Sequence, residues 1–106
     1  MDKERKQRFA RNEAVFREVN ERIEELTRES EWLALMCECG NPQCKEPLRL
    51  TVAEYERVRQ EPTHFLVAPG HVIPEIETVV DGTERFEVVR KLAGEGAFAR
   101  KTDPRS

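Results

Sequence analysis

Three cysteines lie close together in this chain, and no other residues are better suited to chemistry. Cys37, Cys39 and Cys44 form a C-x-C-x4-C pattern around a Gly-Asn-Pro turn. Thiolates are soft, anionic donors, and four such donors arranged as a tetrahedron complete a structural zinc site. Gly40 follows the second cysteine and can adopt a left-handed conformation, which would turn backbone N–H groups toward the sulfurs. The pattern therefore predicts one zinc ion held by this turn.

A fourth ligand must come from elsewhere, because the chain has only three cysteines and two histidines. His71 follows a Pro-Gly turn at the end of a predicted strand, so its ring is free to reach a neighbouring turn. His64 lies at the other end of that strand. We predict His71 as the fourth ligand in preference to His64 and to Glu38. A [2Fe–2S] cluster is less favoured, since families that use three Cys and one His place the third Cys close to the His.

The composition sets limits on the fold and on the partners. The chain has 106 residues, of which 38% are hydrophobic and 37% charged, and a net charge of −3. Its core is therefore thin, and a metal would help to hold it. The acidic balance speaks against binding to nucleic acid. No segment resembles a signal peptide or a membrane span, which predicts a cytoplasmic protein with no membrane contact. Cysteines in that compartment favour metal over disulfides.

The first 30 residues predict an amphipathic helix. Phe9, Phe16, Val19, Ile23 and Leu26 recur at helical spacing on an Arg- and Glu-rich background,. We expect this stripe to pack on its own domain. The alternative is that it binds a protein partner or a second copy through its last four members.

Asn12 interrupts this stripe. It is either a polar position in a helix–helix seam or the N-cap of a helix that begins at Glu13.

Residues 31–92 predict a metal-binding α+β domain. Apolar or alternating runs at 32–37, 47–50 and 64–68 indicate strands,. Thr51 and Glu54 have the spacing of a capping box before a short helix. Asp81-Gly82 indicates a hairpin, although 74–80 would also fit a helical turn.

Together these segments predict a long N-terminal helix on a small, mainly antiparallel sheet with one short inserted helix. Residues 93–106 are expected to form a loosely ordered tail. The expected core residues are Trp32, Leu33, Leu35, Leu48, Leu50, Tyr55, Val58, Phe65, Val67, Phe86 and Val88.

The stretches NEAVFREVNERIEEL, CECGNPQC, LTVAEYERVRQEPTHFLVAPGH and EVVRK carry a resemblance that covers most of the chain. On these stretches the chain resembles a group of small uncharacterised bacterial proteins of the actinobacterial type. The resemblance implies a soluble bacterial protein in which Cys37, Cys39, Cys44 and His71 form one motif. It implies no reaction.

These features predict a structural-zinc domain that acts as a protein-binding or regulatory module, and no catalytic residue. One alternative is a zinc-dependent enzyme with Glu38 or His64 as general base, although no known catalytic motif is present. A thiol-based redox or metal sensor is another alternative. A nucleic-acid-binding zinc module is the last.

Overall fold

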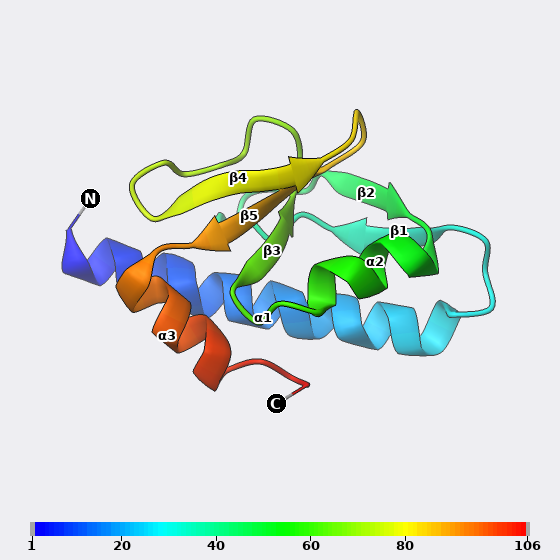
Figure 1. Cartoon of the computed structure of the whole chain (residues 1–106), viewed down its shortest axis with the longest axis horizontal. Coiled ribbons are helices and arrows are strands. Elements are labelled where there is room, and N and C mark those ends of the chain that lie inside the picture. The colour runs from blue at the N-terminus through cyan, green and yellow to red at the C-terminus, as the bar shows by residue number, and fades with distance from the viewer. Residues whose placement is uncertain (1, 106) are drawn as a thin grey trace.

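The computed structural model describes residues 2–105, which form three helices and five strands. The elements are α1 (Lys3–Thr27), β1 (Leu33–Met36), β2 (Pro47–Leu50), α2 (Val52–Arg59), β3 (His64–Val67), β4 (Glu77–Gly82), β5 (Glu87–Lys91) and α3 (Ala93–Lys101). α1 runs along the length of the molecule, with both sheets on one side of it (Figure 1). The predicted α+β architecture with a long N-terminal helix is confirmed.

The strands form two small antiparallel sheets. β1 pairs with β2, and β5 lies between β3 and β4. The two sheets meet just after β1, where the Glu38 N–H donates to the carbonyl of Leu66 at 2.7 Å. β4 and β5 form the expected hairpin, but Asp81 and Gly82 lie in β4 beside a register shift, and the chain turns after them.

The core agrees with the sequence at every expected position except Trp32. The ten other expected residues are buried, with Leu66, Ile76 and Val89 as fully buried additions. Trp32 is 37% exposed. The guanidinium groups of Arg49 and Arg85 lie 4.8 and 5.0 Å from its ring centroid. Cation–π contacts with these arginines therefore stabilise an indole that the core does not cover.

The orientation of α1 differs from the prediction. Its apolar stripe faces the domain only in part. Phe9, Phe16 and Ile23 are half-buried, and Ile23 packs against the core. Val19 and Leu26 are 36% and 75% exposed, as is Val15 beside them at 55%. The buried residues of α1 are Ala10, Glu13, Arg17, Asn20 and Glu24. The helix thus presents a polar face to the rest of the protein.

Partners from distant segments explain why α1 buries these polar side chains. The buried ammonium group of Lys91 pairs with the carboxylates of both Glu13 and Glu77. Arg17 donates to the backbone carbonyls of Pro62 at 2.6 Å and Ala99 at 2.7 Å. Its guanidinium carbon also lies 4.4 Å from the centroid of the Phe65 ring. A buried charge is tolerated when it is paired and hydrogen-bonded in this way, so α1 can dock through charged groups.

Helix boundaries settle two further expectations. α1 begins at Lys3 with Asp2 as N-cap, so Asn12 lies inside the helix and caps nothing. The capping box of α2 is confirmed, because Glu54 N–H donates to the Thr51 hydroxyl and the Thr51 N–H donates to the Glu54 carboxylate.

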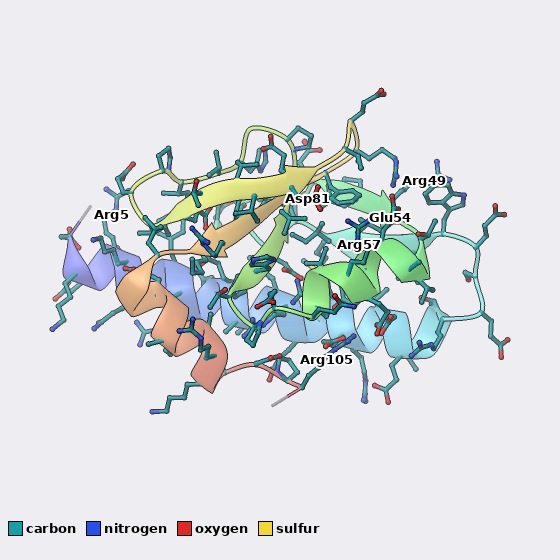
Figure 2. The ribbon with its side chains drawn as sticks, in the orientation of Figure 1. Arg5, Arg49, Glu54, Arg57, Asp81 and Arg105 are labelled. Carbon is teal, nitrogen blue, oxygen red and sulfur yellow. The ribbon has the colours of Figure 1, made fainter. Side chains whose placement is uncertain are left out.

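The expectation of a loosely ordered tail is wrong for most of the segment after residue 92. α3 forms there, and its Ala99 is buried. Beyond α3, Arg105 pairs with Glu21 and Glu56 at 2.5 and 2.7 Å. These contacts with α1 and α2 hold the C-terminal segment; Figure 2 shows Arg105 beneath the α1–α2 side of the molecule.

Candidate metal centre

The structure brings the four predicted ligands together from three segments. Cys37 and Cys39 follow β1, Cys44 precedes β2, and His71 lies in the turn after β3. Four ligand atoms, one from each residue, all lie within 4.8 Å of one another. This cluster could hold one metal ion.

The spacing of the ligand atoms suits a tetrahedral ion. The Nδ1 atom of His71 is 3.6 Å from the Sγ atom of Cys37 and 3.6 Å from that of Cys44. With Zn–S of about 2.3 Å and Zn–N of about 2.0–2.1 Å, a tetrahedral angle places sulfur and nitrogen about 3.6 Å apart. The two distances from His71 therefore fit a single tetrahedral ion.

Backbone N–H groups stabilise the sulfurs. The Ala68 N–H donates to Cys37 Sγ at 3.1 Å. The Asn41 N–H donates to the sulfur of Cys39. Gly40, which lies between Cys39 and Asn41, has a φ of +81°. This is the left-handed conformation expected from the sequence, and it turns the following N–H toward the thiolate.

The cysteines share protons unequally. A hydrogen bond from the Cys37 thiol is the largest influence on Cys39 and lowers the pKa of Cys39 to about 5. The same hydrogen bond, helped by burial, raises the pKa of Cys37. A lowered thiol pKa favours the thiolate, which is the form that binds metals.

α1 contacts the loop of residues 37–46 between β1 and β2, which we call the metal loop. The Asn12 side-chain amide donates to the carbonyl of Gly40 at 2.9 Å. A Cβ atom on Gly40 would lie 2.8 Å from Cδ1 of Phe9 and 2.9 Å from Cγ of Glu13. Only glycine fits between the loop and the helix. The Asn12 hydrogen bond holds the loop against α1, so Asn12 has a positioning role instead of interrupting a seam or capping a helix.

Glu38 points away from the cluster, as the sequence suggested. Its buried carboxylate accepts hydrogen bonds from Arg59 at 2.7 Å and from the Leu66 N–H at 2.9 Å. The Asn20 side chain donates a third, at 2.7 Å. Glu38 therefore links α1, α2 and β3. Because its carboxylate oxygens already accept these hydrogen bonds, Glu38 is not free to act as a metal ligand or as a general base.

His64 also lies outside the cluster. It begins β3, whereas Ala68, which donates to Cys37, follows the other end of that strand. His64 lines a separate cavity of about 420 Å³ between α2 and the β4–β5 hairpin. Burial lowers the pKa of His64 below its ordinary value. Neither general base expected for the enzyme alternative is therefore available at the cluster.

The sequence contained no sign of the buried polar groups that support the centre. Arg59, Asn20 and Glu38 form a connected set, and Asn20 also bonds both the N–H and the carbonyl of Met36 at 2.8 Å. Polar residues on a helix usually face solvent, so spacing alone could not have identified them.

No protein-family model, curated protein or solved structure matches this chain. The resemblance to the bacterial group stays a prediction. In the part of the chain that the structure describes, no helix has the length and apolar character to cross a bilayer. The function has to be inferred from the centre itself.

Proposed function

We propose that Cys37, Cys39, Cys44 and His71 bind one Zn²⁺ as a structural centre, and that the chain is a zinc-stabilised module that binds protein instead of catalysing a reaction. The observation that carries this proposal is the convergence of three sulfurs and one imidazole nitrogen within 4.8 Å. Three thiolates and an imidazole are a common ligand set of structural zinc.

The ligand count favours a structural role over catalysis. Four protein ligands close a tetrahedral sphere, whereas catalytic zinc keeps one position for water. The ion would carry a net charge of −1 with three thiolates. The N–H groups of Ala68 and Asn41 offset part of that charge,.

The position of the centre gives the ion a clear structural task. Cys37 and Cys39 belong to the end of β1, and His71 belongs to the turn after β3. One ion would therefore join the two small sheets, which share no ladder with each other. Because a preformed site rarely exists in the unfolded chain, the free energy of metal binding would add to the stability of the fold.

A [2Fe–2S] cluster is the alternative that uses the same residues. Each of its irons takes two protein ligands, so the ligands form two separate pairs. Here four donors surround one point. Zinc fits this arrangement better.

The first test is the metal content of protein purified without added metal, measured by mass spectrometry together with the absorption spectrum. We expect one colourless zinc per chain. A coloured iron–sulfur spectrum would replace zinc by a cluster. A folded chain with three titratable thiols and no metal would refute the site.

A matched pair of histidine variants tests the fourth ligand. His71→Ala is expected to lower zinc affinity and the melting temperature, while His64→Ala is expected to retain both, because His64 lies outside the cluster. Cys39→Ser is expected to unfold the domain at physiological temperature. If Cys39→Ser kept the melting temperature and near-UV spectrum of the parent, a structural role for the centre would be wrong.

A further inference from the structure

Three apolar side chains lie on the face of α1 that points away from the domain. Val15, Val19 and Leu26, which we call the outer stripe, are 55%, 36% and 75% exposed. The opposite face of the same helix is buried through Glu13, Arg17 and other polar residues. Exposed apolar stripes on a helix mark contact surfaces, and residues 2–105 leave the outer stripe uncovered,.

The spacing of the outer stripe is that of a coiled-coil seam. Val15, Val19, Arg22 and Leu26 are all exposed and follow one another at intervals of four, three and four residues. This alternation keeps one face toward a partner helix. The half-buried side chains of Phe16 and Ile23 flank this seam. The cover expected for such a face is another helix.

The charges of α1 indicate which helix would bind to it. In its first half Lys3, Arg5, Arg8 and Arg11 are exposed, against the single exposed acid Glu4. In the second half and the turn after it, exposed acids outnumber exposed bases; they are Glu18, Glu25, Glu29 and Glu31, against Arg22 and Arg28. Figure 2 shows Arg5 at the end of α1 farthest from the loop into β1. A helix with a basic first half and an acidic second half complements an antiparallel copy of itself.

We propose that α1 binds α1 of a second copy of this chain in antiparallel orientation, forming a symmetric dimer. Val15 then lies opposite Val19 of the second copy, and Arg11 lies beside Glu25 of the second copy. The inference rests on the protein-binding part of the proposed function, since it names a second copy of this chain as the partner.

Symmetry strengthens the charge argument. A two-fold axis repeats each contact, so one Arg11–Glu25 pairing occurs twice. Glu25 now pairs with Arg22 at 3.7 Å, and both side chains are at least 70% exposed. An exposed pair of this kind contributes little and is free to rearrange. A parallel pairing would instead set the basic halves against each other.

The size of the seam sets the strength expected. The apolar contact consists of a few layers on a helix about 37 Å long. Interfaces below roughly 1,200 Å² in total belong to weak, transient complexes. We therefore expect a dissociation constant in the micromolar range or weaker.

Sedimentation equilibrium of the full, zinc-loaded chain from 1 μM to 1 mM tests the proposal. We expect a monomer–dimer equilibrium that Val19→Glu combined with Leu26→Glu shifts to monomer by at least tenfold in dissociation constant. Both positions are exposed, so circular dichroism and zinc content should stay unchanged. A chain that stays monomeric up to 1 mM, or a dimer that this double variant leaves intact, would overturn the proposal.

Charge reversal tests the antiparallel register. Arg11→Glu and Glu25→Arg are each expected to weaken the dimer about threefold to tenfold, and the two together are expected to restore it. Glu84→Arg makes the same charge change at an exposed position of the β4–β5 turn and should have no effect. A dimer without rescue in the double variant would refute this register.

Zinc content separates the two proposals. One zinc per chain in a monomeric protein would refute the dimer and leave the metal centre standing. A dimer without bound metal would refute the metal centre and leave the α1 pairing standing.

Discussion

Replacing Gly40 by alanine adds one carbon atom, the Cβ, where the metal loop contacts α1. Gly40 has a φ of +81°, a conformation that costs a residue with a Cβ about 1–2 kcal/mol,. The new Cβ would also lie 2.8 Å from Cδ1 of Phe9, 2.9 Å from Cγ of Glu13 and 3.0 Å from the Phe9 carbonyl. The Phe9 carbonyl belongs to the backbone of α1, so the loop or the helix has to move.

The magnitude follows from adding the two effects. Overpacking of a close contact costs about 1–3 kcal/mol. With the conformational term, Gly40→Ala should lower the free energy of unfolding by about 2–5 kcal/mol. Gly70 provides the matched control, because its φ is +82° but nothing lies within 4 Å of its added Cβ. Gly70→Ala should therefore cost only about 1–2 kcal/mol.

Urea denaturation followed by circular dichroism, at saturating zinc, measures both variants. Each glycine is adjacent to a proposed metal ligand, Cys39 or His71, so both variants disturb a loop that carries a proposed ligand. Zinc content is checked first to establish that each remains loaded. Costs that agree within about 0.5 kcal/mol would refute the close approach of Gly40 to α1, since only that approach distinguishes the two sites.

Three further predictions concern the groups that hold the helices. Asn20→Leu should lower the free energy of unfolding by about 3 kcal/mol, because it removes one donor to the buried Glu38 carboxylate and the side-chain partner of both the Met36 N–H and carbonyl, and a loss below about 1 kcal/mol would contradict this,. Burial raises the pKa of Glu13 from 4.5 to about 8, so the folded state binds the extra proton and stability falls as the pH rises through that window,. Unfolding measured at pH 5 and pH 8 should show Glu13→Gln losing less stability than the parent over this rise, and parallel losses would argue against a buried carboxyl. Thr51→Ala should cost about 1 kcal/mol by thermal unfolding, with Thr51→Ser as the control that keeps the cap to Glu54.

Local features were predictable from the sequence because their partners are close in the chain. The capping box joins residues three apart, and the three cysteines share one turn. We preferred His71 over His64 from the sequence, and His71 is the histidine that lies with the cysteines. That choice depended on the Pro-Gly turn, which separates the His71 ring from the packed strand.

The same local reasoning failed for α1 and for the last segment. Periodicity identified which residues of α1 share a face, but not what each face meets. α3 was missed because two glycines lower its helix propensity, and its stability comes from contacts such as that between Arg17 and the Ala99 carbonyl,.

The sequence by itself therefore determined α1, α2, the strands, the hairpins and the donor set of the candidate metal centre, but not α3. Only the tertiary structure decided that α1 buries polar groups and leaves Val15, Val19 and Leu26 exposed. The physical reason is that the Glu13 carboxyl group meets its hydrogen-bond donor Lys91 across 78 positions of the chain. Burying a charge is favourable only with such a partner in place, and no local pattern of residues records which partner the fold will bring.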